Sequence, residues 1–158
     1  MNASIEFLLN KASAAQIAEH LLRCDADFVP PLSGRVKIRD YAQKIASKAT
    51  RFEAWSGGTL VGLVAAYCND HEKRITYITS VSVLKSLTGK GIAARLIGRC
   101  IENAKASGMW QVSLEVAVDN TSAIMLYRKS GFVAGKADAP FVTMNLSLES
   151  GEEHEKQT

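Results

Sequence analysis

The stretch Val81-Ser-Val-Leu-Lys-Ser-Leu-Thr-Gly-Lys-Gly-Ile-Ala-Ala-Arg-Leu-Ile97 decides how the rest of this chain is interpreted. A run of β-forming residues passes through a short polar turn with Gly89 and Gly91, and then directly into a helical pattern. The first amides of a helix lack intrahelical partners and carry partial positive charge, and glycines leave them open to an anion. The stretch therefore predicts a strand–turn–helix unit that binds phosphate.

Length and composition are typical of one soluble domain. The chain has 158 residues, of which 47% are hydrophobic and 22% are charged, and we expect the domain to span residues 1–148. No apolar run approaches the roughly 20 residues of a membrane helix. The N-terminus lacks the pattern of a secretory signal. A cytoplasmic protein without a membrane partner is therefore expected.

The charge is unevenly distributed along the chain. The net charge is +3, but segment 149–158 holds four glutamates against one lysine, so residues 1–148 carry +6. This charge suits an anionic ligand, but it is not the dense basic surface of a nucleic-acid binder, and no nucleic-acid partner is expected. The tail itself is polar and aperiodic, which predicts disorder.

Neither the cysteines nor the histidines form a metal-binding pattern. They are scattered, without a C-x-x-C pair, at Cys24, Cys68, Cys100, His20, His71 and His154. Each cysteine has apolar neighbours, which predicts buried, reduced thiols. We therefore expect no metal cofactor.

The N-terminal half predicts two helices followed by three antiparallel strands. Ser13 and Gln16 have capping-box spacing, which starts a helix that ends near Asp25, and a single apolar stripe predicts a second helix over 38–49. Strands are expected over 4–9, 51–56, 59–69 and 75–84, with Gly57-Gly58 forming a hairpin turn. Alternation within the last strand predicts Val81 and Val83 on one face and Ile78 on the other.

The C-terminal half predicts helix, strand, helix and two strands. The helix after Gly91 ends at Gly108, the next strand covers 112–118, and Asn120 or Asp119 caps a short helix that ends at Gly131. The apolar runs 132–133 and 141–148 predict a final antiparallel pair. Because a helix joins strands 75–84 and 112–118, these two should be parallel. The fold class is α+β, with a mixed, mostly antiparallel sheet of about six to seven strands and about four helices.

Two phosphate-binding classes fit the glycine turn poorly. A nucleoside triphosphate loop needs Ser or Thr after its lysine, but Lys90 is followed by Gly91. A dinucleotide fingerprint matches at Gly89–Ala94, with Glu115 some two dozen residues on. However, Lys85–Thr88 separates the strand from the first glycine, and antiparallel strands precede the turn instead of a βαβαβ unit.

A third class matches in the order of its elements. Thr88-Gly-Lys-Gly-Ile-Ala93 resembles the [Q/R]-x-x-G-x-[G/A] motif of the GCN5-related N-acetyltransferases (GNAT), and Asn120–Phe132 resembles their second signature, N-x-x-A-x-x-x-Y-x-x-x-G-F. The resemblance covers about residues 4–148 and implies a GNAT-like fold. Leu114-Glu-Val116, followed by the tyrosine, is similar to the ribosomal-protein alanine acetyltransferases.

The resemblance also implies where acetyl-CoA, the co-substrate, binds. Its pyrophosphate would contact the glycine turn, and its pantetheine arm would pair with the strand before the turn. The residues implied are Val81, Val83, Thr88, Gly89, Lys90, Gly91, Ile92, Ala93, Ala94 and Asn120. Thr88 departs from the usual Arg or Gln, which puts acetyl-CoA affinity in question, although Lys85 or Lys90 could compensate.

Two residues are the candidates for proton chemistry. The resemblance implies that Tyr127 is the general acid for the departing CoA thiolate. Glu115 is the candidate base for the acceptor ammonium, and alternation places it opposite Leu114 and Val116. The alternative is a solvent-facing or salt-bridged glutamate.

The expected activity is direct acetyl transfer to a primary amine, which could be a small amine, an amino sugar or a peptide N-terminus. The family binds its acceptor through the first helices and their loop, here Phe28–Arg35 and Tyr41, and Asp25 and Asp27 could attract an amine. A non-catalytic acyl-CoA-binding sensor of the same fold is the alternative. A homodimer is one assembly that the chain could form.

Overall fold

The computed structural model describes residues 4–148, so the prediction for the tail lies outside the described residues. Within them, one seven-stranded sheet has the order β1-β2-β3-β4-β5-β7-β6. The strands are β1 Glu6–Leu9, β2 Thr50–Ser56, β3 Thr59–Asp70, β4 Ile75–Val83, β5 Gln111–Ala117, β6 Val133–Asp138 and β7 Phe141–Ser147. The helices are α1 Ala14–Cys24, α2 Ile38–Lys48, α3 Ile92–Ala106 and α4 Thr121–Lys129, with 3₁₀ turns η1 Asp25–Asp27, η2 Leu32–Gly34 and η3 Lys85–Leu87.

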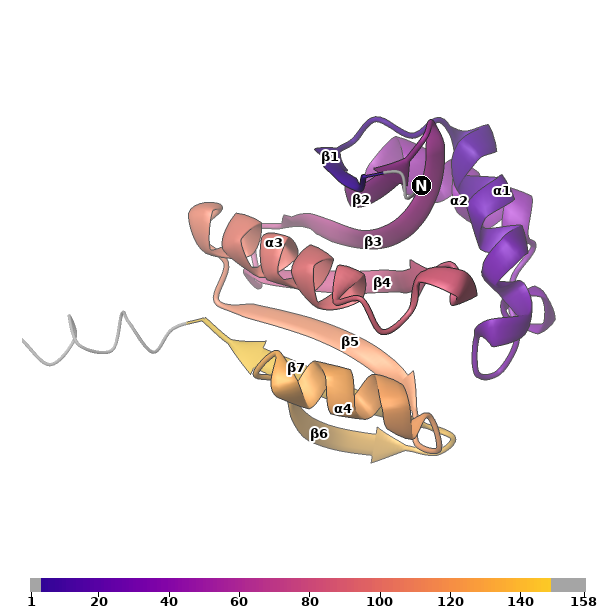
Figure 1. Cartoon of the computed structure of the whole chain (residues 1–158). Helices are drawn as coiled ribbons and strands as arrows, with labels where there is room; N and C mark the ends of the chain where they lie inside the picture. Colours follow the sequence, from indigo (N-terminus) through magenta and orange to yellow (C-terminus); the bar gives the residue numbers. More distant parts are fainter. Residues whose placement is uncertain (1–3, 149–158) are drawn as a thin grey trace, which may run out of the picture.

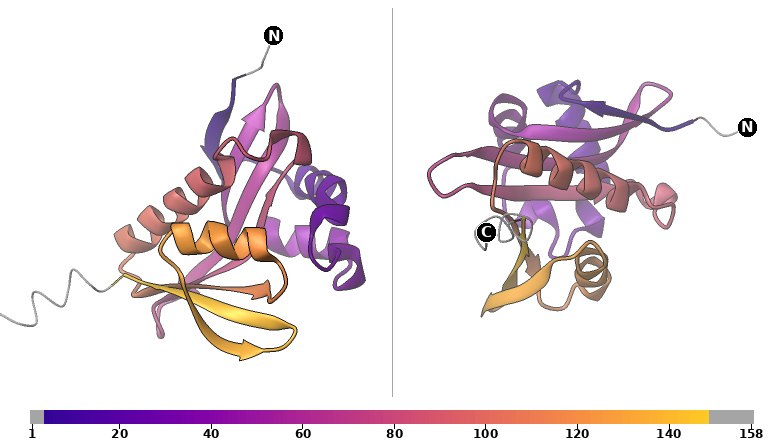
Figure 2. Two further views of the ribbon diagram at one scale, coloured as in Figure 1. Left: turned by 60° about the horizontal axis from the view of Figure 1, so that its bottom comes forward. Right: turned by 90° about the vertical axis from the view of Figure 1, so that its left-hand side faces the viewer.

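The sheet separates two hydrophobic cores (Figures 1 and 2). Helices α3 and α4 cover one face, and α1 and α2 cover the other. The α3/α4 core contains Leu96, Ile97 and Leu114, and the α1/α2 core contains Ile17 and Leu63. Burial of these apolar side chains on both faces provides most of the driving force for folding. The predicted α+β fold class is confirmed.

The connections follow the predicted pattern. The capping box of α1 is present, since Ser13 Oγ accepts from the Gln16 amide at 3.1 Å and the Gln16 side chain accepts from the Ser13 amide at 2.9 Å. Strands β4 and β5 are parallel, as predicted from the helical crossover. All other neighbouring strands are antiparallel.

Strand β4 corrects the prediction of strict alternation. Ala65 of β3 pairs with Ser80, whereas the next residue, Ala66, pairs with Ile78, so Thr79 is an extra residue in β4. A bulge of one residue reverses the alternation that follows it. As a result Ile78 packs in the same core as Val81 and Val83, and the prediction that they lie on opposite faces was wrong.

Strand β6 is longer than the two-residue run predicted from Phe132-Val133. It spans Val133–Asp138 at the edge of the sheet, and all six residues are exposed. Phe132 precedes the strand and is buried. An exposed edge strand needs no alternating apolar face, so its sequence carried no periodic signal.

A buried carboxylate connects the start of the chain to β2. Glu53 is 0% exposed, and it accepts hydrogen bonds from the amides of Lys11 and Ala12, from Trp55 Nε1 and from Arg51 Nε, at 2.9–3.3 Å. Because these donors come from two segments about 40 positions apart, Glu53 orients α1 against the sheet.

Among residues 4–148, none of the helices has the length and apolar character needed to span a bilayer.

Candidate active site

A cleft lies where β4 and β5 separate. The two strands share only three residue pairs, from Ile75 with Gln111 to Tyr77 with Ser113. Figure 1 shows them diverging beyond these pairs. The cleft has a volume of about 460 Å³ and is lined from both faces of the sheet. Beyond Tyr77, the edge of β4 that faces β5 has no strand partner within residues 4–148, so the backbone groups of this edge that no side chain occupies are available to a ligand.

The glycine turn follows β4 through η3. Gly89 and Gly91 have φ values of +83° and +80°, a conformation that other residues adopt only with strain. A Cβ at either glycine would meet nothing within 4 Å, so the glycines are required by the backbone conformation and not by packing. Gly91 is the N-cap of α3 and makes no side-chain capping bond. The first amides of α3 are therefore free of a side-chain partner, as an anion site requires.

The residues predicted to bind the cofactor fall into two groups. One group lines the cleft and consists of Val81, Val83, Thr88, Ala93 and Asn120. The other group lies at or beyond the exposed turn and consists of Gly89, Lys90, Gly91 and Ala94. Ile92 belongs to neither group, because its side chain is buried in the α3/α4 core. Only its backbone amide is placed to meet a ligand.

Thr88 has a short side chain that is engaged within its own turn. Its hydroxyl donates to the Lys85 carbonyl at 2.9 Å, which closes the 3₁₀ turn η3. The Thr88 side chain is thus engaged with the backbone of its own turn. Lys85 and Lys90 are exposed on either side of it.

Helix α4 presents the second signature to the cleft. Asn120 Oδ1 accepts from the Ala123 amide at 3.3 Å, which confirms its predicted capping role. Tyr127 is 7% exposed and packs edge-on against Phe132, with ring centroids 6.0 Å apart. Burial raises the pKa of Tyr127 to about 12. The phenol therefore keeps its proton at neutral pH, as a proton donor must.

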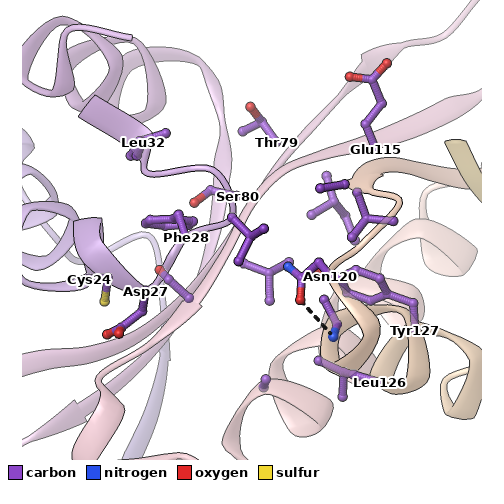
Figure 3. Close-up of a pocket in the computed structure, with 18 of the residues that line it drawn as sticks. Cys24, Asp27, Phe28, Leu32, Thr79, Ser80, Glu115, Asn120, Leu126 and Tyr127 are labelled. Carbon is purple, nitrogen blue, oxygen red and sulfur yellow. Dashed lines mark hydrogen bonds between the residues drawn. The ribbon is translucent and has the colours of Figure 1, made fainter. Parts of the chain in front are cut away.

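Glu115 lies on the opposite face of the sheet from Tyr127. Its neighbours Leu114 and Val116 pack in the α3/α4 core together with Tyr127, whereas Glu115 is exposed on the other side of β5. Figure 3 shows its carboxylate pointing away from Tyr127. Both residues line the same cleft, and Glu115 has no hydrogen bond or ion pair within the described part of the chain. The opening between β4 and β5 thus connects two candidate proton-transfer groups.

Several cleft residues on β4 were not singled out from the sequence. Tyr77 is partly exposed, and its pKa is raised, first by burial and then by the negative charge of Glu115, while Arg35 acts in the opposite direction. Ser80 Oγ is buried without a hydrogen-bond partner and lines the cleft. A buried hydroxyl without a partner is uncommon, and at the cleft it offers a hydrogen-bonding group to a ligand. Polar residues inside an apolar strand were the signal that could have identified them.

The loop between α1 and α2 forms the opposite wall. Cys24, the last residue of α1, and Asp27, Phe28 and Leu32 of the loop line the cleft, and Figure 3 shows them across it from Tyr127. The Asp25 carboxylate accepts from the Ser33 amide at 2.7 Å, and hydrogen bonding by the Ser33 side chain and then by its amide lowers the pKa of Asp25. Asp25 therefore shapes the loop and does not line the cleft. Tyr41 lines it and donates to the Thr79 carbonyl at 2.6 Å.

A histidine is buried behind this wall. His20 Nδ1 lies 3.0 Å from the Leu60 carbonyl, and Nε2 lies 2.9 Å from Ser82 Oγ. Since the carbonyl can only accept, Nδ1 carries the proton and the Ser82 hydroxyl donates to Nε2. Burial lowers the pKa of His20 to about 4.

Within residues 4–148, no cluster of three or more His, Cys, Asp or Glu side chains could hold a metal ion.

Comparison with known proteins decides the family. The model of the acetyltransferase (GNAT) family matches residues 14–132. The chain belongs to this family. N-alpha-acetyltransferase MAK3 of Arabidopsis thaliana is 36% identical over 86 residues, which are 54% of this chain and 45% of that protein. The matched region thus spans about half of that relative's length.

Two further relatives cover the GNAT domain more completely. IAA acetyltransferase of Azospirillum brasilense is 31% identical over 137 residues, which are 86% of this chain and 87% of that protein. The crystal structure of PaiA N-acetyltransferase from Thermoplasma acidophilum in complex with coenzyme A superposes with a TM-score of 0.70, at 18% identity, over 91% of this chain and 99% of that one. At this identity the superposition establishes the GNAT fold.

Proposed function

We propose that this GNAT protein is an acetyl-CoA-dependent N-acetyltransferase that transfers acetyl directly to a primary amine. One observation carries the proposal. A single cleft crosses the sheet between β4 and β5 and has Glu115 on one face and Tyr127 on the other. This arrangement lets a donor approach from the α3/α4 side and an acceptor from the α1/α2 side.

The residues present fit acetyl-CoA. The unpaired edge of β4 beyond Tyr77 offers backbone donors and acceptors to the amides of a pantetheine arm. The free N-terminus of α3, after two glycines of positive φ, suits the pyrophosphate. The related PaiA structure contains coenzyme A, which supports the same ligand here. Acetyl-CoA would supply the acetyl thioester, and we assign this chain the binding and the proton transfers.

Glu115 acts as the base on the acceptor side. The ammonium of the acceptor must lose a proton before its nitrogen can attack, and the Glu115 carboxylate accepts that proton directly or through a water molecule. Its exposure within the cleft and its freedom from other partners leave it available for this role. Nitrogen then bonds to the carbonyl carbon and releases its second proton to solvent, and the carbon–sulfur bond breaks.

Tyr127 acts as the acid on the donor side. The departing sulfur becomes a thiolate, and the Tyr127 hydroxyl donates its proton to it. A phenol with a pKa of about 12 is a weaker acid than a thiol, whose pKa is ordinarily about 8.5. Transfer of this proton to the thiolate is therefore uphill, and it is completed because the tyrosinate, the stronger base of the two, regains a proton from solvent before the next turnover.

The acceptor is proposed as the α-amine of a peptide or amino acid. Leu114-Glu-Val116 resembles the alanine acetyltransferases of ribosomal proteins, and a relative carries the name N-alpha-acetyltransferase. Small amines and amino sugars are the alternatives to be separated by assay. The rival proposal is a sensor that binds acyl-CoA without turnover.

The decisive experiment measures thiol release from acetyl-CoA with a panel of peptides, amino acids, diamines and amino sugars. We expect turnover with at least one α-amine, and a drop in kcat of roughly 100-fold in Tyr127→Phe with unchanged CoA binding by thermal shift. Tyr67→Phe is the matched control, because Tyr67 lies outside the cleft lining and its hydroxyl makes no hydrogen bond within residues 4–148. CoA binding without turnover on any acceptor would favour the sensor, and equal kcat in wild type and Tyr127→Phe would remove the acid role.

A further inference from the structure

The cleft has two anionic side chains and one cationic side chain, and the cation has no role in the proposed reaction. Three charged side chains line the cleft: Asp27, Arg35 and Glu115. Arg35 is the single cation among the described lining residues, and no ion pair involves it in residues 4–148. A guanidinium always carries its charge and offers donors in a fixed fork that matches a carboxylate.

Arg35 is held in a defined position although it is exposed. Its guanidinium carbon lies 4.9 Å from the centre of the Phe141 ring at the start of β7. Its amide donates to the Leu32 carbonyl at 2.9 Å, and Leu32 is 5% exposed. The Asp25–Ser33 bond stabilises the same loop. A stacked, preorganised guanidinium loses little freedom when it binds an anion.

Arg35 lies near the proposed base. Arg35 stacks on Phe141, and the register of β5 and β7 pairs Phe141 with Ala117, two residues after Glu115 on the same face of β5. The guanidinium and the carboxylate therefore lie on the same side of the sheet, and the charges of both act on the nearby Tyr77, in opposite directions. Asp27 instead acts on Cys24, and Figure 3 shows Asp27 and Cys24 at the end of the cleft away from Glu115. If an acceptor binds with its ammonium at Glu115, a group that is only a few bonds from that ammonium would thus lie beside Arg35.

We propose that Arg35 selects acceptors that carry a carboxylate a few bonds from the reacting amine. This inference rests on the proposed N-acetyltransferase function and names its substrate class. Two sources provide that chemistry: the α-carboxylate of a free amino acid, and the acidic side chain of a peptide whose first residue is Asp or Glu. A zwitterion also suits the cleft better than a phosphate dianion, because the three lining charges sum to −1.

The test uses matched acceptors and three variants. The acceptors are an amino acid with its carboxamide, and a tetrapeptide beginning with Asp with its counterpart beginning with Asn. The variants are Arg35→Gln, Arg35→Lys and, as the control, Lys37→Gln, which removes a nearby exposed cation outside the cleft lining. Steady-state acetylation gives kcat and KM for each combination.

For wild type we expect the carboxylate member of at least one pair to have the higher kcat/KM. Arg35→Gln should lower kcat/KM for that member by roughly 10- to 100-fold, mainly through KM, and leave its uncharged partner unchanged. Arg35→Lys should recover part of the loss, and Lys37→Gln should match wild type. The affected pair identifies the source, either the free amino acid or the acidic N-terminal residue.

Two results would overturn the inference. If Arg35→Gln weakened both members of each pair equally, Arg35 would only support the loop through its stack on Phe141. If wild type acetylated amines without any carboxylate preference, the selectivity would be absent while the proposed N-acetyltransferase function stood. Absence of acetylation with every amine would overturn the proposed function as well, so the two failures are distinguishable.

Discussion

Glu53 and Glu115 are two glutamates within apolar strands of the same sheet, and they have opposite environments. Glu53 on β2 is fully buried and accepts hydrogen bonds from four donors. Glu115 on β5 is exposed in the cleft and lacks a partner among the described residues. A buried carboxylate with satisfied oxygens stabilises one fold, whereas an unpaired carboxylate in a cleft is free to exchange protons. The contrast separates a structural acid from a candidate catalytic one.

The largest expected effect is on turnover in Glu115→Gln. Loss of the base should lower kcat by roughly 1,000-fold with the thermal midpoint within about 1 °C of wild type, because this side chain has no hydrogen bond or ion pair to lose among residues 4–148. Thiol-release kinetics measure the change in kcat, and a melting curve measures the thermal midpoint. Activity close to wild type would show that Glu115 is only a solvated surface residue.

The second effect is on stability in Glu53→Gln. The substitution leaves the buried Arg51 guanidinium, 3.3 Å from Glu53, without its counter-charge and turns one acceptor oxygen into a donor facing other donors. We expect the free energy of unfolding to fall by about 3 kcal/mol, which lowers the melting temperature by about 6–12 °C for a chain of this size. Denaturant titration measures the free energy of unfolding. If Glu53→Gln instead lost activity at full stability, the contrast between the two glutamates would be wrong.

The third effect is the pH dependence contributed by His20. Because burial holds its folded pKa at about 4 against an unfolded value of 6.5, the unfolded chain binds the extra proton between these pH values. The free energy of unfolding should therefore fall as pH drops from about 6.5 to 4, with about 2 kcal/mol lost at pH 5.

The variant His20→Gln isolates the contribution of His20 to this pH dependence. Its own stability will differ from wild type, but the slope of its unfolding free energy between pH 6.5 and 4 should be smaller. Chemical denaturation at several pH values gives both slopes. Identical slopes would mean that His20 is not the titrating group.

The smallest effect is on cofactor affinity in Thr88→Arg. Replacement of the short hydroxyl by the long cation usual in the GNAT family should lower the Kd for CoA a few-fold, because an exposed charge pair contributes about 0.2–1 kcal/mol. Calorimetry at two salt concentrations tests it, and the gain should shrink at high salt. Ser86→Arg, outside the cleft lining, is the control for general electrostatic attraction; an equal gain there would remove any specific role of position 88.

Much of the fold was determined by local patterns in the sequence. The capping box at Ser13, the Gly57-Gly58 hairpin and the helical crossover after Gly91 predict elements that the structure contains. Such features depend on backbone conformation and on the period of apolar residues, which neighbouring residues along the chain largely set. The second signature likewise identified the family from Asn120–Phe132, because its spacing reflects one short helix.

Other features were decided only by the tertiary structure. The extra residue Thr79 in β4 depends on pairing with β3, and no local pattern marked it. The contact between Arg35 and Phe141 joins segments more than 100 positions apart. Glu53 and Glu115 look equivalent in sequence, because each is one charge in an apolar strand. Only the donors that the folded chain brings to Glu53, and the separation of β4 from β5 beside Glu115, give the two carboxylates their different chemistry.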